Sequence, residues 1–372
     1  MQVKAVVMTE PGRMEMRDFP KPKIAEDAML IKVDATGVCG SDMHSYLGHS
    51  KLDLPVILGH EVKGTIEELG AKAQEMMSVV GGPLKEGDKV AIVPSSQSCG
   101  RCYNCMYTPH KTALCTGRTV YGFTNCEKPP HLFGGFAEYM YIHPRSWVFK
   151  IPESVLEREI GVLAEPMAVA TRAVERAYSP GIPHISEGYG IGKTVAVLGS
   201  GPIGLLTTAV LKRTGAGKII VTDLSDTRLE MAQEMGATHT INASGSMEDR
   251  VQQIMDLTDG IGVEIVFECA GVPQVFKEAL EIAARGGKLI EVGHYTDPGP
   301  VDINPHTICK KDLDVLGVWA YPQIQFKTAL AALAQSRAPL EDLITHRLPL
   351  EQTEDAIHML GKDGVLKVAI EP

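Results

Sequence analysis

Four cysteines in the first third of the chain have a spacing that suits a metal ion. They form the pattern Cys99-x2-Cys102-x2-Cys105-x9-Cys115. Thiolates at this density bind zinc tetrahedrally, and four sulfur ligands leave no coordination position open for a substrate. The pattern therefore predicts a structural zinc in a lobe covering about 95–120. Cys126 is close enough in sequence to compete as the fourth ligand, and unpaired surface thiols are the alternative to a metal.

A second set of metal-binding residue types occurs earlier in the chain. Cys39 lies in GVCGSDMH, and His60 and Glu61 are adjacent in LGHE. One thiolate, one imidazole and one carboxylate can hold zinc and leave a position open, as catalysis by zinc requires. Each residue alone also fits an ordinary buried position. The prediction of a catalytic site therefore depends on their combination with the cysteine lobe and with a nucleotide-binding motif.

That motif is the glycine pattern Gly199-x-Gly201-x-x-Gly204, which follows a predicted strand and opens a predicted helix. Gly199 permits a tight turn, Gly201 lets the backbone approach a pyrophosphate, and Gly204 allows close packing of helix on strand. Pro202 and Ile203 complete the turn at the N-terminus of the helix, where the helix dipole favours phosphate.

Asp223 ends the next predicted strand and selects between the two nicotinamide cofactors. Its carboxylate can accept hydrogen bonds from the adenosine ribose and would repel a 2′-phosphate, so NAD is favoured over NADP. The alternative is that Asp223 or Ser225 only caps the following helix. Arg228, a turn further on, is expected to flank the adenine, although it could also pair with a 2′-phosphate.

The elements that would position these residues fall into two kinds. Short alternating runs broken by turn residues from Met1 to Lys150 predict a β-rich, barrel-like domain. A helix is predicted over Ser154–Tyr178, capped by Ser154, and a loop over Ser179–Gly192. Apolar strands then alternate with amphipathic helices, which indicates a parallel, doubly wound sheet, and the chain after Gln323 ends in helices and a strand.

Size and charge narrow the class of protein. A chain of 372 residues exceeds the usual single core, so two domains are expected. No apolar run is long enough to span a membrane, and no secretory signal is visible, so a cytoplasmic protein is expected. The net charge of −10 disfavours a nucleic-acid partner. Clustered cysteines in such a protein favour metal binding over disulfides.

The order of GVCGSDMH, LGHE, the cysteine lobe, LAEPMAVA, VLGSGPIG and VTDLSDTRL resembles the zinc-containing medium-chain dehydrogenases of the alcohol dehydrogenase superfamily, over essentially the whole chain. The AEP and VTDLS runs are similar to the sorbitol/threonine dehydrogenase-like branch. The resemblance implies a GroES-like catalytic domain over 1–166, a Rossmann NAD-binding domain over 167–317, and a segment over 318–372 that returns to the catalytic domain. It also implies a homodimer or homotetramer, with Val318-Trp319 where edge strands pair between subunits.

The resemblance further implies that Cys39 and His60 bind the catalytic zinc. Glu165, in the AEP run, or Glu61 would complete the site, and the sequence leaves both open. Asp42 would orient His60 through its other ring nitrogen. With the cysteine lobe, about two zinc ions per chain are expected.

Further roles follow from the same resemblance. Ser41 would accept the substrate proton and pass it through the cofactor ribose to His44. Val292 and Gly293 would line the nicotinamide site. Lys367 would contact the pyrophosphate, with a solvated lysine as the alternative.

The predicted reaction is hydride transfer between a secondary alcohol or polyol and NAD. Simple primary or secondary alcohols, or an amino alcohol such as threonine, are alternative substrates. A zinc-free, NADPH-dependent enone or quinone reductase and an idle nucleotide-binding protein are the other hypotheses. Two departures from the family bear on this: the last cysteine gap is nine residues rather than seven, and the loop over Ala71–Glu86 is enlarged. That loop, the Tyr46–His49 region and the neighbourhood of Tyr121 are expected to form the substrate pocket.

Overall fold

The computed structural model describes residues 1–177 and 192–372, so the loop predicted after residue 178 lies outside the described residues. The chain divides into two compact units. The first comprises 1–165, 321–335 and 341–372, and the second comprises 166–320 and 336–340. The domain boundaries expected from the sequence were 166/167 and 317/318. Among the described residues, no helix is both long and apolar enough to cross a membrane.

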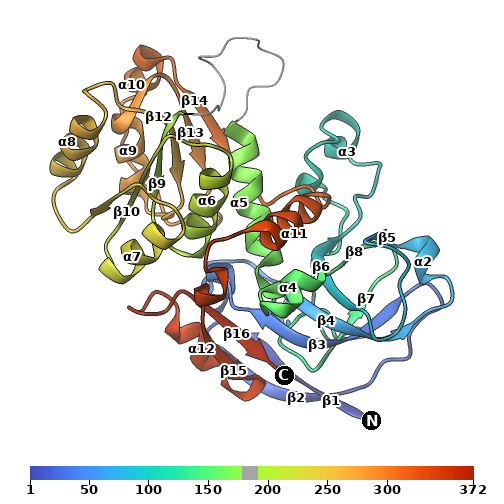
Figure 1. Cartoon of the computed structure of the whole chain (residues 1–372). Helices are drawn as coiled ribbons and strands as arrows, with labels where there is room; N and C mark the ends of the chain where they lie inside the picture. The colour runs from blue at the N-terminus through green and yellow to red at the C-terminus, as the bar shows by residue number, and fades with distance from the viewer. Residues whose placement is uncertain (178–191) are drawn as a thin grey trace. The chain divides into compact units, whose positions relative to one another are not determined.

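The first unit is built on strands (Figure 1). An eight-stranded sheet runs in the order β15-β16-β3-β4-β6-β8-β5, with β7 paired to β3, and β1 and β2 form a separate antiparallel pair. The bounds are β1 Gln2–Glu10, β2 Arg13–Pro20, β3 Met29–Gly37, β4 Glu61–Leu69, β5 Ser78–Val80, β6 Lys89–Ser96, β7 Tyr139–Ile142, β8 Ser146–Lys150, β15 Ile344–Pro349 and β16 Lys367–Glu371.

Short helices connect these strands. They are α1 Gly40–Tyr46, α2 Ala73–Met76, α3 Tyr103–Tyr107, α4 Glu153–Glu157, α11 Gln325–Gln335 and α12 Thr353–Met359, with 3-10 turns at Thr112–Leu114, Gly161–Leu163, Leu340–Leu343 and Leu350–Gln352. The enlarged segment over Ala71–Glu86 therefore contains a helical turn, α2, and a short strand, β5.

The second unit is the predicted parallel sheet. Its six strands run in the order β11-β10-β9-β12-β13-β14, all parallel. The bounds are β9 Thr194–Leu198, β10 Lys218–Asp223, β11 His239–Asn242, β12 Val263–Glu268, β13 Ala283–Glu291 and β14 Asp314–Gly317, with helices α5 Ala164–Ala177, α6 Pro202–Arg213, α7 Asp226–Glu234, α8 Met247–Leu257, α9 Pro273–Ile282 and α10 Pro305–Lys311.

Both faces of this sheet are covered, which explains its nearly continuous apolar strands. On β9, Ala196 and Leu198 belong to the core shared with α8 and α9. Val197 points to the opposite face, where it lies next to Gly204 of α6. The order reverses between β9 and β12, and ligands bind outside the carboxyl ends of the strands at such a point. The predicted combination of a β-rich unit and a doubly wound sheet is confirmed.

One predicted helix is wrong in detail. Over Ser154–Ala177 the structure has α4, a 3-10 turn and α5 in place of a single helix. Ser154 lies inside α4, whose N-cap is Pro152. The break follows α4 directly, because Glu159 has a left-handed φ of 55°. This break starts α5 at Ala164, so that Glu165 lies in its first turn.

Candidate functional site

Three potential zinc ligands meet where β3 and β4 pair. Cys39 is the N-cap of α1, just after β3, and Glu61 is the first residue of β4, opposite Gly37. One ligand atom from each of Cys39, His60 and Glu61 lies within 4.8 Å of the others. A Cβ on Gly37 would lie 1.9 Å from Glu61 Oε2, so a glycine is needed beside this carboxylate. The thiolate, imidazole and carboxylate set fits a zinc ion with a free position.

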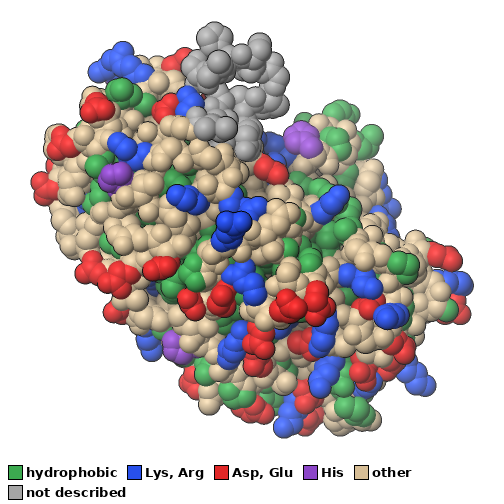
Figure 2. All heavy atoms as spheres, in the orientation of Figure 1, with side chains coloured by type: hydrophobic (Ala, Val, Ile, Leu, Met, Phe, Trp, Pro, Cys, Tyr) green, Lys and Arg blue, Asp and Glu red, His purple; other side chains and the backbone are tan. Residues whose placement is uncertain are grey.

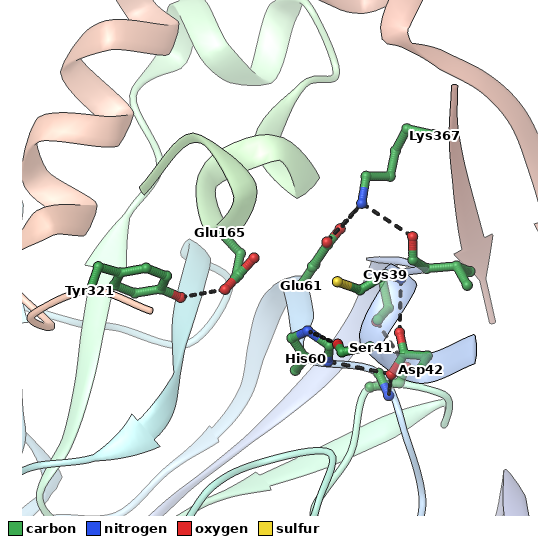
Figure 3. Close-up of polar contacts among 12 residues, drawn as sticks. Cys39, Ser41, Asp42, His60, Glu61, Glu165, Tyr321 and Lys367 are labelled. Carbon is green, nitrogen blue, oxygen red and sulfur yellow. Dashed lines mark hydrogen bonds and ion pairs between the residues drawn. The ribbon is translucent and has the colours of Figure 1, made fainter. Parts of the chain in front are cut away.

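Asp42 holds two of these ligands in place (Figure 3). Its Oδ2 accepts a 2.9 Å hydrogen bond from the backbone N–H of Cys39. Its Oδ1 lies 3.4 Å from His60 Nδ1. The other ring nitrogen, His60 Nε2, lies 3.4 Å from Ser41 Oγ. Asp42 is fully buried, so it can fix the ring orientation of His60 without competition from water.

Glu61 is paired with Lys367 of the last strand. Lys367 Nζ lies 2.7 Å from both carboxylate oxygens of Glu61 and donates a further hydrogen bond of 3.1 Å to the carbonyl of Val38. The two residues are 1% and 3% exposed. The alternative of a solvated Lys367 is therefore wrong, because β16 carries this side chain into the core beside β3.

Glu165 lies apart from the three-ligand group and has its own partner. Its Oε1 accepts a 2.7 Å hydrogen bond from the hydroxyl of Tyr321. Burial raises the pKa of Glu165 to about 7, against the lowering effect of His60 and Tyr321. Figure 3 shows the Glu165 carboxylate on the Tyr321 side of Glu61. Of the two glutamates that the sequence left open, only Glu61 is within ligand distance of Cys39 and His60.

Tyr321 was missed by the sequence analysis, as was Phe123, whose ring lies 5.3 Å from that of His60. Neither residue stands in a spaced motif. The one feature that could have indicated Tyr321 is its position where the chain re-enters the first unit.

Ser41 and His44 both lie on α1. His44 Nδ1 is 3.0 Å from His49 Nδ1, and burial, followed by the charge of His49, lowers the pKa of His44. Among the described residues, the side chain of Ser41 contacts His60 and that of His44 contacts His49, with no hydrogen bond between Ser41 and His44. A relay between them therefore needs a bridging group, which the resemblance gives as the cofactor ribose.

Two aromatic residues expected near the substrate are otherwise engaged. Tyr121 is fully buried; its hydroxyl lies 2.7 Å from Ser146 Oγ and accepts a hydrogen bond from the N–H of His143. The Tyr46 hydroxyl lies 2.6 Å from Glu354 Oε1. Both hydroxyls already have protein partners, while Phe123, in the neighbourhood of Tyr121, lies beside His60, so the expected pocket walls stay a prediction.

The cysteine lobe brings its four thiols together. Sulfur atoms of Cys99, Cys102, Cys105 and Cys115 lie within 4.8 Å of one another. Backbone N–H groups, led by that of Cys105, lower the pKa of Cys102 to about 6, which favours the metal-binding thiolate. The four sulfurs fit a closed zinc site.

Cys126 does not compete for this site. It is 1% exposed and belongs to the hydrophobic core of the first unit, and burial raises its pKa to about 11. Next to the lobe, hydrophobic side chains gather over α3 on the face shown in Figure 2. There the exposed residues are Tyr103, Met106 and Tyr107.

In the second unit, the glycine loop has the geometry of a phosphate cradle. Gly199 has φ +94°, and a Cβ on Gly204 would lie 1.9 Å from the carbonyl oxygen of Gly199. By contrast, a Cβ on Gly201 would meet no atom within 4 Å, so the space above it is open. Pro202 and Ile203 begin α6, with Gly201 as its N-cap. The buried hydroxyl of Ser200 has no hydrogen-bond partner among the described residues, which fits a ligand at this loop.

Asp223 ends β10 beside this loop. Its Oδ2 accepts a 2.7 Å hydrogen bond from the N–H of Ser200, and its Oδ1 accepts one of 3.0 Å from Ser225. The helix cap is Ser225, whose hydroxyl accepts from the N–H of Arg228. Asp223 thus connects β10 to the glycine loop, and Arg228 lies on the first turns of α7. The N–H groups of Val292 and Gly293, just after β13, both donate 3.0 Å hydrogen bonds to the carbonyl of Glu268.

Comparison with known proteins assigns both halves of the chain. Residues 25–153 match the alcohol dehydrogenase GroES-like domain, and residues 202–335 match the zinc-binding dehydrogenase family. A sorbitol dehydrogenase of Bacillus subtilis is 34% identical over 377 residues, covering 100% of this chain and 97% of that protein.

Solved structures agree with this assignment. An alcohol dehydrogenase from Thermotoga maritima superposes with a TM-score of 0.88 at 30% identity, covering 100% of both chains. A zinc-binding dehydrogenase from Sinorhizobium meliloti, solved with NADP bound, gives a TM-score of 0.84 at 30% identity, also covering 100% of both.

Proposed function

Because the chain belongs to the zinc-containing medium-chain dehydrogenases, in their sorbitol/threonine dehydrogenase-like branch, we propose that it oxidises a polyol or secondary alcohol with zinc and NAD. The observation that carries this proposal is the convergence of Cys39, His60 and Glu61 at one end of β3 and β4. An oxidoreductase without zinc would have no use for that set.

When bound, zinc would supply Lewis acidity to the alcohol oxygen, and NAD would accept the hydride. The protein's own contribution is positioning and proton handling. Cys39 and His60 hold the metal, with Glu61 as the third ligand within reach. Asp42 orients both Cys39 and His60, because its carboxylate contacts the backbone N–H of Cys39 and the ring of His60.

The proton leaves through α1 in this proposal. Ser41 Oγ, beside His60, accepts it from the substrate hydroxyl. The cofactor ribose would bridge Ser41 to His44, which lies on the same helix beside His49 and returns the proton to solvent. Since burial lowers the pKa of His44, its imidazole is neutral and can accept a proton near neutral pH.

Glu165 and Tyr321 support a polyhydroxylated substrate. Together they present a partly buried carboxylate and a buried phenol in the first unit, the same unit as the metal-binding set. The two groups already hydrogen-bond to each other, and the carboxylate of Glu165 has further lone pairs to which a neighbouring substrate hydroxyl can donate. The sorbitol dehydrogenase of Bacillus subtilis, similar over the whole chain, supports the same substrate class.

We propose NAD as the preferred cofactor on the strength of Asp223. Its carboxylate stands at the carboxyl end of β10, where a 2′-phosphate would meet a negative charge. The Sinorhizobium meliloti protein was solved with NADP, so relatives of this fold can hold either cofactor and the preference must be measured.

We also propose a homodimer formed along β14. This strand ends the order of the six-stranded sheet, so its outer edge pairs with no other strand among residues 1–177 and 192–372. Val315 and Trp319 are 37% and 50% exposed there, and Trp319 stacks on Tyr295 with ring centroids 4.7 Å apart. Light scattering on the purified protein tests it: a monomer would rule the dimer out.

The decisive test is cofactor reduction over a panel of polyols, secondary alcohols, primary alcohols and threonine, together with metal analysis. We expect turnover of polyols and a loss of turnover in Cys39→Ser that leaves NAD binding nearly unchanged. Cys309→Ser, at an exposed cysteine of the second unit, is the matched control and should remain active. Full activity in zinc-free protein, or a clear preference for NADPH and an enone, would overturn the proposal.

A further inference from the structure

Two carboxylates stand opposite each other at the carboxyl end of the parallel sheet. Glu268 is the last residue of β12 and Glu291 is the last residue of β13, and the two are register partners. The strands lie side by side in Figure 1. His294 follows three residues after Glu291. This cluster belongs entirely to the second unit, and no residue in it is part of the Cys39 set.

The contacts within the cluster leave acceptor atoms without donors. Glu268 Oε1 accepts hydrogen bonds of 2.9 and 3.0 Å from the N–H groups of Ala270 and Gly271. His294 Nδ1 lies 2.8 Å from Glu291 Oε1 and 3.4 Å from Glu268 Oε2. Within the described residues, Glu268 Oε2 and Glu291 Oε2 receive no hydrogen bond. Glu268 is fully buried, so water cannot replace the missing donor freely.

Such a pair needs added positive charge. Like charges directly opposite on neighbouring strands destabilise a sheet, and the effect is stronger where water is excluded. One imidazole cannot balance two ionised carboxylates. Either the carboxyl groups share a proton, or a cation occupies the space between them.

We propose that Glu268, Glu291 and His294 form a binding site for a divalent transition-metal ion, separate from the catalytic and cysteine sites. One ligand atom from each residue lies within 4.8 Å of the others. Ligands about 2.1 Å from a shared ion lie about 3 to 3.5 Å apart, so the observed 2.8 and 3.4 Å separations need only small adjustments.

The donor set selects the class of ion. Imidazole with two carboxylates suits manganese, iron or zinc, whereas magnesium and calcium prefer oxygen ligands alone. To bind an ion through Nδ1, His294 would carry its ring proton on Nε2, and the ion would take the place of the contact between Nδ1 and Glu291 Oε1. With three protein ligands, the remaining coordination positions would be filled by water.

Gly293 preserves the space for this site. A Cβ there would lie 2.4 Å from Glu268 Oε2 and 2.3 Å from the backbone nitrogen of Gly271. Any other residue would therefore displace the carboxylate from its position next to His294.

The test compares metal content among full-length variants. Zinc-loaded protein is dialysed against Mn2+, freed of unbound ions and subjected to elemental analysis, and Mn2+ binding is followed by electron paramagnetic resonance. We expect Glu268→Gln and His294→Gln to hold about one ion per chain fewer than the wild type, or to bind Mn2+ at least about tenfold more weakly. Glu281→Gln, at an exposed glutamate on α9, is the matched control and should bind like the wild type.

The possible outcomes separate cleanly. Equal metal content in the wild type and both variants, with Mn2+ and with Zn2+, would overturn the proposal. It would indicate that the carboxyl groups of Glu268 and Glu291 share a proton instead. The test compares the metal content of each variant with that of the wild type. Loss of the catalytic zinc or of the zinc in the cysteine lobe lowers the metal content of all of them equally, so it does not affect the difference. Should buried Glu268→Gln fail to fold, as judged by circular dichroism, His294→Gln at the half-exposed position still decides the question.

Discussion

Lys367 holds Glu61 through both carboxylate oxygens, at 2.7 Å each, in a position where neither residue is more than 3% exposed. The two residues come from opposite ends of the chain. They meet because β16 pairs with β3, which places Lys367 beside the strand that ends at Gly37, two residues before Cys39. The charge of a proposed zinc ligand is thus balanced by the last strand of the chain.

Lys367→Met is expected to destabilise the protein by about 3–5 kcal/mol, because it leaves the Glu61 carboxylate buried without a counter-ion. Adding Glu61→Gln to this variant should recover part of the loss, since no unpaired charge then remains. Urea unfolding at neutral pH measures the free energy of unfolding of both variants. Lys362→Met, at an exposed lysine after α12, should change little. Equal losses of stability in Lys367→Met and Lys362→Met would contradict a stabilising role for the buried pair of Lys367 and Glu61.

Asp42→Asn is expected to weaken zinc binding at the catalytic site by about tenfold to a hundredfold. The substitution removes the charge that orients His60 and accepts from the N–H of Cys39. Zinc retention during titration with a chelator gives the measurement. The control is Asp53→Asn, at an exposed aspartate. Unchanged retention in Asp42→Asn would show that this carboxylate has no part in metal binding.

Cys102→Ser should cost the protein one zinc and make the segment between Cys99 and Cys115 sensitive to proteolysis. Cys126→Ala should keep the metal, because Cys126 lies in the hydrophobic core rather than in the lobe. Elemental analysis and limited proteolysis distinguish the two variants. A loss of zinc in Cys126→Ala would return Cys126 to the ligand set.

Asp223→Ser should raise the ratio of kcat/KM for NADP to that for NAD by about tenfold or more, since it removes a charge that opposes the 2′-phosphate. The variant also loses hydrogen bonds to Ser200 and Ser225, so a general weakening of cofactor binding is expected alongside. Steady-state kinetics with both cofactors separates the two effects. If the ratio stays constant while both affinities fall, Asp223 only supports the loop.

His143 gives an expected pH dependence of stability. Burial lowers the pKa of this imidazole, which stacks on Phe133 with ring centroids 4.9 Å apart. The folded state therefore favours the neutral ring, and its stabilising contribution is present above the unfolded pKa of about 6.5 and is lost as the pH falls below it. From pH 7.5 to 5.5, the midpoint temperature of unfolding should fall less steeply for His143→Phe than for the wild type. For His306→Asn, at an exposed histidine, it should fall as it does for the wild type.

The residues that the sequence analysis identified stand in local patterns. The glycines of the nucleotide loop and the clustered cysteines are close in sequence, so their spacing alone constrains geometry. The contacts that were not predicted depend on long-range pairing. Lys367 was expected at the pyrophosphate, and its contact with Glu61 arises only through the register of β16 on β3. Tyr321, which was not identified, reaches Glu165 only where the chain returns to the first unit. No spacing rule encodes such contacts.

The same division explains contacts that differ from expectation. The hydroxyls of Tyr46 and Tyr121 lie against Glu354 and Ser146, partners that their sequence positions do not indicate. Ser154 has the residue type of a helix cap, yet α4 begins one residue earlier, at Glu153. Residue type indicates what a side chain can do, and packing decides which partner it meets.

The division of the chain into units has a consequence for its synthesis. Residues 166–320 of the second unit lie between parts of the first, which lacks β15 and β16 until the last residues are made. On the ribosome, the six parallel strands are therefore all available before the first unit can close its sheet. Until β16 is made, Glu61 lacks its counter-ion, so the metal-binding end of β3 and β4 cannot reach its final charge balance before Lys367 is added.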